Sequence, residues 1–269
     1  MKASVNKTCL VGPAIAQEQF IAEHLFFYLV RGTMSGYYGG KDYTLRSGEY
    51  GIARKNRLSR QTHAKDDGEA EKIVFVFDEE FLRKFQEKHP VTVTPFKREE
   101  SFLSLPENEL IPHFIHSLTP YYNSWGEIDK AFFDVKREEL LLIMLQLNPG
   151  LSGVFFDYGA PDKIDLEEFM NRNYLFNVTI DRFAYLTGRS LSAFKRDFHA
   201  IFNETPSRWL VRKRLEDAYF LIGKKRKKPS DIYIDLGFET LSHFSFAFKK
   251  LFGQTPTGLS EQHSSLNTY

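Results

Sequence analysis

Short runs of aromatic and β-branched residues, interrupted by glycines, characterise the chain from residue 23 to residue 78. The runs read HLFFYLVRG, MSGYYGGKDYTL, RSGEYGIARK and EKIVFVFDE. Strands punctuated by glycine at this spacing are typical of an antiparallel sandwich or barrel. The pair Gly39-Gly40 is expected to form a hairpin turn between two of the strands.

The hydrophobic period changes after the last of these runs. Residues 77–89 place Phe81, Leu82 and Phe85 on one helical face, with carboxylates at the start, where the helix dipole favours negative charge. Pro90 ends this predicted helix.

Two further helical patterns follow, around residues 110–122 and 128–148. The second carries a broad apolar stripe that includes Phe132, Val135, Leu142 and Leu145. Such a stripe fits packing on the chain's own sheet or packing against a partner subunit, and the pattern leaves both open. Asn148-Pro149-Gly150 ends the helix, and residues 153–164 are the expected linker.

The last hundred residues contain an internal repeat. Residues 186–206 and 236–256 align at a fixed offset of 50 with eight identities in 21 positions. The identical pairs are Leu186/Leu236, Leu191/Leu241, Ser192/Ser242, Phe194/Phe244, Phe198/Phe248, Phe202/Phe252, Thr205/Thr255 and Pro206/Pro256. Phe recurs every fourth residue in each copy, which predicts a helix with one aromatic face and one face free for polar groups.

Each copy resembles a helix-turn-helix. A small residue, Ser190 or Thr240, is placed to cap the Phe-rich helix, and a shorter helical pattern precedes it at residues 179–188 or 230–238. Residues 206–223 form one continuous helical pattern between the copies. Two recognition helices held about 34 Å apart would suit one face of B-DNA.

Charge is divided between the two parts of the chain. The formal net charge of +1 combines −6 over residues 1–169, from 20 Lys+Arg and 26 Asp+Glu, with +7 over residues 170–269, from 16 and 9. The second part is therefore the candidate for binding a polyanion. Its basic residues outside the run at 224–228 include Lys195, Arg196, Arg208, Arg212, Lys213, Arg214, Lys249 and Lys250. A Phe stripe alone is usually plain core and a basic run is usually a solvated loop, so the prediction depends on the combination of repeat, spacing and charge.

Composition indicates the class of protein and the cellular compartment in which it is expected. With 269 residues, 42% hydrophobic and 26% charged, the chain is predicted to be globular with two domains. A single cysteine, Cys9, excludes an internal disulfide framework and favours a reducing compartment. The longest apolar stretches are too short to span a membrane, and the N-terminus lacks a signal-peptide core. A cytoplasmic protein without membrane association is therefore expected.

Residues 231–256, DIYIDLGFETLSHFSFAFKKLFGQTP, resemble the second helix-turn-helix of AraC/XylS-type transcription regulators. The matching positions are Gly237-Phe238, Ser242-His243-Phe244, Phe248-Lys249 and Gly253-Gln254-Thr255-Pro256. The first copy is similar to the family's first helix-turn-helix at Ala184, Ser190, Phe194, Arg196, Phe198, Pro206, Trp209-Leu210 and Arg214-Leu215. The front half resembles the family's cupin-like effector-binding domain only loosely.

The resemblance implies an α+β protein with an N-terminal cupin-like antiparallel β-barrel, flanking helices and a C-terminal all-α domain of two helix-turn-helix units joined by a long helix. The implied division is a sensor and dimerisation domain at residues 1–152, a linker at 153–164, an AraC-type DNA-binding domain at 165–262 and a flexible tail at 263–269. Its implied function is that of a sequence-specific transcription regulator, most commonly an activator, with double-stranded DNA, RNA polymerase, a small-molecule effector and a second copy as expected partners.

The outer faces of the two recognition helices are implied to contact DNA. The candidates are Ser190, Ser192, Lys195, Arg196 and His199 in the first unit and Thr240, Ser242, His243, Ser245, Phe246 and Lys249 in the second. Arg196 suits bidentate pairing with guanine O6 and N7. Most other Lys and Arg residues would contact phosphate.

The second unit departs from the family pattern in several places. Phe246 stands where many relatives carry Arg, so it is expected either to contact a thymine methyl or to pack. Tyr233 replaces a small Ala, Pro229 replaces an Ile, and the usual Tyr-Arg after Pro256 is absent. Base reading is therefore expected mainly from the first unit.

The N-terminal domain is expected to bind a small apolar or aromatic effector, or none. Candidate lining residues are Phe26, Tyr28, Tyr37, His63 and Phe75. An alternative is a metal-dependent cupin-type enzyme with a basic tail that tethers nucleic acid. That chemistry needs converging histidines and a carboxylate, whereas His24 and His63 are isolated, and His113 and His116 near Glu109 fit surface positions better. No metal, cofactor or catalytic residue is therefore predicted.

Overall fold

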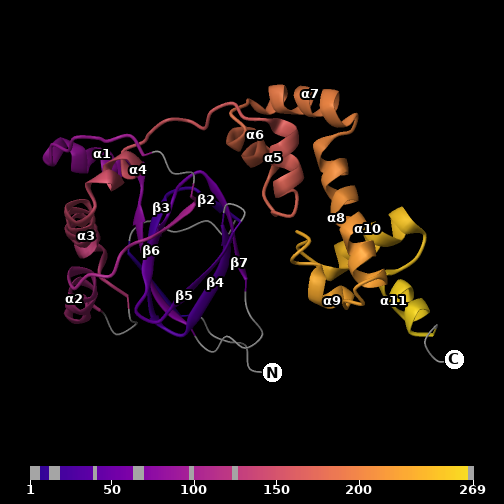
Figure 1. The fold of residues 1–269 in the computed structure, drawn as a ribbon, viewed down its shortest axis with the longest axis horizontal. Coiled ribbons are helices and arrows are strands. Elements are labelled where there is room, and N and C mark those ends of the chain that lie inside the picture. Colours follow the sequence, from indigo (N-terminus) through magenta and orange to yellow (C-terminus); the bar gives the residue numbers. More distant parts are fainter. Residues whose placement is uncertain are drawn as a thin grey trace. The chain divides into compact units, whose positions relative to one another are not determined.

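The structure of the chain is a computed structural model that describes residues 7–11, 19–38, 41–62, 70–96, 100–122 and 127–265. It divides into two units, Met1–Gly159 and Ala160–Tyr269 (Figure 1). The first unit combines strands with helices and the second is helical. The chain is therefore α+β, with its sheets in the N-terminal part and a helical C-terminal part, as predicted.

The first unit contains two sheets among its described residues. The strands are β1 (Lys7–Val11), β2 (Phe20–Ile21), β3 (His24–Arg31), β4 (Thr33–Tyr38), β5 (Lys41–Arg46), β6 (Tyr50–Ala53), β7 (Arg57–Thr62), β8 (Glu71–Phe77) and β9 (Phe102–Ser104). One sheet has the order β1-β8-β3-β6-β9 and the other β2-β7-β4-β5.

The prediction of an antiparallel barrel is wrong in two respects. The described strands do not close into one barrel, and β1 pairs with β8 in parallel, Lys7 opposite Glu71 and Val11 opposite Phe75. Alternation along a strand reports which side chains are buried but not which strand lies beside it, nor in which direction. Pairing across some 60 residues is thus invisible to local pattern.

Helices cover the five-stranded sheet on the face away from the second sheet (Figure 1). They are α1 (Glu79–Lys88), α2 (Leu110–Ser117), α3 (Phe133–Leu147) and α4 (Ser152–Phe155), with 3₁₀ turns at Thr119–Tyr121, Lys130–Phe132 and Pro149–Leu151. Phe26, Phe75 and Phe77 of the sheet share a core with these helices. On the opposite face, Leu25 and Phe27 pack with residues of the second sheet.

The first predicted helix is confirmed as α1. Its N-cap is Asp78, whose side chain accepts a hydrogen bond from the Phe81 backbone N–H at 2.9 Å. Phe81, Leu82 and Phe85 are the buried residues of α1, as the period predicted.

Most of the apolar stripe predicted at residues 128–148 faces outward, but Leu145 is half-buried and packs against the core of the first unit. Leu140, Leu141 and Met144 are buried, whereas Phe132, Val135 and Leu142 are exposed, Val135 by 60%. The buried face also includes Lys136 and Arg137, whose charges the apolar count did not assign to the core. The guanidinium of Arg137 is held by the Val76 carbonyl and the Asp78 carboxylate, which fixes this face of α3 inward.

The linker predicted at residues 153–164 begins too early. Residues Val154, Phe155 and Phe156 are buried in the core of the first unit, where Phe155 packs on Phe77 with ring centroids 5.3 Å apart. Gly153 lies so close to the Thr94 carbonyl that a Cβ would come within 2.0 Å of it. Residues 153–156 are therefore part of the core of the first unit, because three apolar side chains in a row need cover from water.

The second unit consists of helices in the described residues. They are α5 (Leu166–Asn173), α6 (Ile180–Leu186), α7 (Leu191–Phe202), α8 (Pro206–Gly223), α9 (Pro229–Ile232), α10 (Leu241–Phe252) and α11 (Pro256–Ser265). The long helix α8 has the predicted bounds, and α6–α7 and α9–α10 are the two predicted helix-turn-helix pairs. The second short helix ends at Ile232, earlier than the pattern suggested, and continues as turns to Gly237.

Three predictions fall on residues outside the described ranges. These are the hairpin turn at Gly39-Gly40, the candidate effector residue His63, and residues 266–269 of the expected tail.

Candidate DNA-binding surface

The two recognition helices α7 and α10 are built alike. Each is capped by a hydroxyl: Ser190 accepts from the Ala193 N–H at 3.3 Å, and Thr240 accepts from the His243 N–H at 3.1 Å. Both residues were candidates for DNA contact, and in this structure their side-chain oxygens satisfy backbone donors at the helix start.

The phenylalanine repeat forms the core of each unit. Phe194 and Phe198 of α7, like Phe244 and Phe248 of α10, are fully buried. Four buried rings fix which side of each helix faces out, because residues three or four positions apart share a face.

The candidate readers of α7 lie on one exposed face. Ser192, Lys195, Arg196 and His199 follow the spacing i, i+3, i+4, i+7, and all four are exposed. This face offers a guanidinium, an ammonium, an imidazole and a hydroxyl within two turns of helix, which are the groups that read base edges and phosphates in a major groove.

The corresponding face of α10 differs in chemistry. Ser242, Phe246 and Lys249 are exposed there and Ser245 is half-buried. Phe246 is 71% exposed, the highest value among the large hydrophobic residues that the structure describes. It therefore packs little within its own unit, so of the two roles expected from the sequence the structure does not support packing. His243 is exposed, with its ring 5.7 Å from that of Phe238.

Arg214 of α8, one of the basic residues considered for binding a polyanion, lies inside the unit rather than on its surface. It is buried, and its guanidinium donates to three backbone carbonyls: Tyr174 at 2.7 Å, Phe176 at 2.8 Å and Gly237 at 2.9 Å. Burial lowers the pKa of Arg214 to about 10, so the group stays charged at neutral pH. The side chain ties the segment before the first helix-turn-helix to the turn of the second.

The helical spacing of the sequence could have predicted that Arg214 is buried, but its positive charge suggested a surface position instead. Leu210, Arg214 and Ala218 are four residues apart along α8, so Arg214 lies on the helix's buried stripe. Gly237 accommodates it from the other side: its φ is +79°, and a Cβ there would lie 2.8 Å from the Arg214 Cζ.

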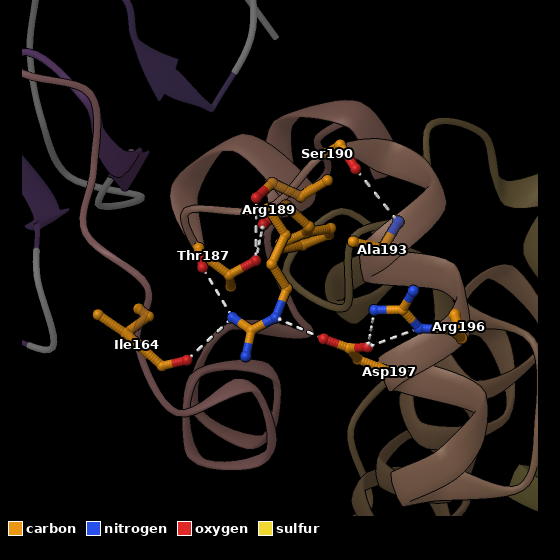
Figure 2. Close-up of polar contacts among 9 residues, drawn as sticks. Ile164, Thr187, Arg189, Ser190, Ala193, Arg196 and Asp197 are labelled. Atoms are coloured by element: carbon orange, nitrogen blue, oxygen red, sulfur yellow. Dashed lines mark hydrogen bonds and ion pairs between the residues drawn. The ribbon is translucent and has the colours of Figure 1, made fainter.

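Two further charged residues were not among the predicted site residues: Asp197 on α7 and Arg189 just before it. Asp197 accepts hydrogen bonds from both Arg196 and Arg189, and Arg189 is nearly buried against the turn between α6 and α7 (Figure 2). No motif points to this cluster, since it depends on how the turn folds back on the helix.

Of the effector candidates that the structure describes, Phe26, Tyr28 and Phe75 belong to one core cluster, and Tyr37 lies apart from them on β4. Phe26 and Phe75 pair across β3 and β8, pack edge to face with ring centroids 6.2 Å apart, and expose no surface. They belong to the packed core under α2, so they are corrected to structural residues. Tyr28 is half-buried beside Tyr50 on the same sheet, whereas Tyr37 is on β4 of the other sheet.

The histidines of the metal-enzyme alternative that the structure describes do not form a metal site. His24 is buried with its Nδ1 accepting from the Lys55 N–H at 3.3 Å. His113 and His116 are exposed on α2. Among the described residues no group of three His, Cys, Asp or Glu side chains is arranged to hold a metal ion. Within those ranges, too, no helix is long and apolar enough to cross a membrane.

A helical unit with two capped recognition helices, exposed polar faces and a net charge of +7 over residues 170–269 defines a tandem helix-turn-helix DNA-binding protein. Residues 183–262 match the helix-turn-helix domain family, and residues 24–152 match the ExsA N-terminal regulatory domain family. The chain belongs to the AraC/XylS family of transcriptional regulators. It is a DNA-binding transcription regulator with an N-terminal regulatory domain.

The chain is similar in sequence to several proteins whose names describe regulators. The chain is 23% identical over 238 residues to the thermoregulatory protein LcrF of Yersinia pestis, a match that covers 86% of each chain. It is 27% identical to the virulence regulon transcriptional activator VirF of Yersinia enterocolitica, over 49% of each chain. The HTH-type transcriptional regulator ExsA of Pseudomonas aeruginosa is 27% identical over 46% of this chain and 45% of its own. The chain thus matches about half the length of two of these relatives.

Proposed function

We propose that the chain recognises specific promoter sequences through the outer faces of α7 and α10 and activates transcription under the control of its first unit. The observation that carries this proposal is the exposed face of α7, where Ser192, Lys195, Arg196 and His199 follow helical spacing over a fully buried Phe core. Insertion of such a face into a major groove would present all four side chains to base edges and phosphates.

The two recognition helices contribute differently in this proposal. Arg196 of α7 reads a guanine, while Phe246 of α10 contacts the methyl group of a thymine, since apolar side chains recognise that group in the major groove. Lys249 and the basic run at residues 224–228 contact phosphates and set the register rather than the sequence.

Residues 1–159 act as the regulatory domain and residues 160–265 as the DNA-binding domain in this proposal. The exposed apolar residues Phe132, in the turn before α3, and Val135 and Leu142, on α3, support a homodimer formed through the first unit. A signal, either a small-molecule effector or a partner, would act by favouring one arrangement of the two domains over another, which requires different affinities for the two.

The remaining partners follow from this role. Contact with RNA polymerase is the proposed route of activation, and the protein is proposed to work in the cytoplasm without membrane association or catalysis of its own. Stoichiometric metal in the purified chain would favour the metal-enzyme alternative instead.

Titration of duplex DNA with the full chain tests the proposal. Affinity should fall steeply with rising salt, because phosphate contacts release counterions. Arg196→Ala should relax discrimination at one base position by about 1–3 kcal/mol, whereas Lys227→Ala should weaken all sequences alike. Salt-insensitive binding, or equal losses on specific and random duplexes for both variants, would refute it.

A further inference from the structure

Asp197 lies between two arginines that have different surroundings (Figure 2). Its Oδ1 accepts from Nε of Arg196 at 3.2 Å and from Nη2 of the same residue at 3.0 Å. Its Oδ2 accepts from Nε of Arg189 at 3.3 Å. One carboxylate therefore joins an exposed arginine on the recognition helix to a second arginine behind it.

Arg189 is a fixed support for this carboxylate. Its side chain is nearly buried, and its Nη1 donates to the carbonyls of Thr187 at 2.7 Å and Ile164 at 2.9 Å. Thr187 is itself buried, with its hydroxyl bonded to the Phe183 and Ala184 carbonyls of α6. The cation behind Asp197 is thus anchored to the turn of the helix-turn-helix and to the segment that enters the unit.

The contact with Asp197 orients Arg196 and leaves the N–H donors at the end of its guanidinium available for other partners. Asp197 engages the edge formed by Nε and Nη2, whereas the Arg196 side chain is 77% exposed. A guanidinium has five N–H donors in one plane. Nη1 and the remaining N–H of Nη2 therefore point away from Asp197, and they form the fork that matches O6 and N7 of guanine.

The charges of the cluster are consistent with this geometry. The hydrogen bond from Arg196, followed by that from Arg189, lowers the pKa of the Asp197 carboxyl, so the group is ionised at neutral pH. Two arginines balance its charge, which limits the repulsion it would otherwise exert on a phosphate backbone.

The second unit lacks the whole cluster. At the offset of 50, Glu239 replaces Arg189, Phe246 replaces Arg196 and Ala247 replaces Asp197, although the Phe core and the capping residues are kept. The repeat therefore preserves the fold of both units and the arginine cluster of only one.

We propose that Asp197 is a positioning residue for base recognition: supported by Arg189, its carboxylate holds Arg196 in the orientation in which the guanidinium reads guanine. A flexible exposed arginine loses rotamer freedom when it binds, and an arginine held beforehand loses less. This inference rests on the proposed role of Arg196 as a base reader.

Selection of duplexes from a randomised pool by the full chain provides the test, with the base preference measured at every position for four proteins. These are the wild type, Arg196→Ala, Asp197→Asn and the double variant. Asp197→Asn should lower the preference roughly threefold to tenfold at the same base pair that Arg196→Ala affects, and should leave the positions read by α10 unchanged. In the Arg196→Ala background it should have no further effect.

Two controls separate positioning from general stability. Asp181→Asn removes an exposed carboxylate from α6 of the same unit and should leave every base preference unchanged. Asp197→Glu keeps the carboxylate and should retain more of the preference than Asp197→Asn.

The possible failures are distinct. Loss of preference at all positions alike in Asp197→Asn, or none at the position that Arg196→Ala affects, overturns the positioning role while the reader role stands. An unchanged profile for Arg196→Ala overturns the reader role and the positioning role with it.

Discussion

Replacing Arg214 by Met should destabilise the DNA-binding unit by about 3–5 kcal/mol. The substitution keeps much of the buried volume of the side chain but removes all of its donors. The carbonyls of Tyr174, Phe176 and Gly237 then lose the donors that now lie at 2.7–2.9 Å.

The magnitude follows from these three acceptors. A buried polar group left without a partner costs about 1–3 kcal/mol, so three would cost roughly 3–9 kcal/mol. The buried charge itself carries a desolvation penalty that its removal relieves, and a carbonyl can recover part of its loss through water. An intermediate value is therefore expected.

Urea unfolding of the full chain, followed by tryptophan fluorescence, measures this loss. The chain has two tryptophans, Trp125 in the first unit and Trp209 in the second. Because Trp209 is buried on α8 beside Phe198, with ring centroids 5.5 Å apart, a Trp125→Phe background makes its emission a reporter of the second unit alone.

Arg208→Met is the matched control on the same helix. The Arg208 side chain is 81% exposed and pairs with Glu204 only at 3.4 Å, so its loss should change the free energy of unfolding by less than about 1 kcal/mol. Arg214→Lys should lose most of the stability as well, since one ammonium does not reproduce the planar fork. A loss below about 1 kcal/mol for Arg214→Met, or an equal loss for Arg208→Met, would refute the role of Arg214 in joining the segment before the first helix-turn-helix to the turn of the second.

Three further substitutions probe other parts of the chain. Gly188→Ala should destabilise far more than Gly253→Ala in urea unfolding: both glycines have positive φ, but a Cβ at Gly188 would lie 2.6 Å from the Asp162 carbonyl, whereas the space at Gly253 is open and only the backbone cost of about 1 kcal/mol applies. Equal losses would show that the close approach at Gly188 does not exist in solution. Burial lowers the pKa of His24 to about 3 from 6.5, so the unfolded chain takes up a proton below pH 6.5 that the folded chain refuses until about pH 3. Stability should therefore fall with pH across this window, and the difference in unfolding free energy between wild type and His24→Phe should change by up to about 1.4 kcal/mol per pH unit; a pH-independent difference would contradict the buried neutral imidazole. Phe246→Ala should leave the melting temperature nearly unchanged, because the ring is 71% exposed, while weakening binding to duplexes with thymine at one position more than to those with uracil there. A large drop in melting temperature would instead indicate that the ring packs within the fold.

Most of the second unit follows from local sequence. The bounds of α8, the caps Ser190 and Thr240 and the buried Phe residues all depend on contacts within about four positions of the chain or on a repeat that the sequence displays directly. The exposed face of α7 follows from the same period, which is why four of the candidate readers lie together on it.

Side chains that bind distant backbone were misassigned or missed. As a basic residue Arg214 was expected to contact phosphate, yet it donates hydrogen bonds to backbone carbonyls that lie 23–40 positions away in sequence. The contact between Asp197 and Arg189 could not be predicted from the sequence, because it forms only when the turn before α7 folds back on the helix. In the first unit, burial of Phe26 and Phe75 depends on α2, which residue alternation along β3 and β8 does not reveal.

The sequence by itself determined that this is a two-part chain with an acidic, strand-rich front and a basic tandem helix-turn-helix, because periodicity, capping and charge are properties of neighbouring residues. Only the tertiary structure decided that β1 joins β8 in parallel, that residues 153–156 belong to the core of the first unit, that most of the apolar stripe at residues 128–148 faces outward and that Arg214 is buried and binds three carbonyls. These features depend on which surfaces remain free once the segments have packed, and that is settled by contacts between residues far apart in the chain, where burial and unmet hydrogen bonds outweigh local preference.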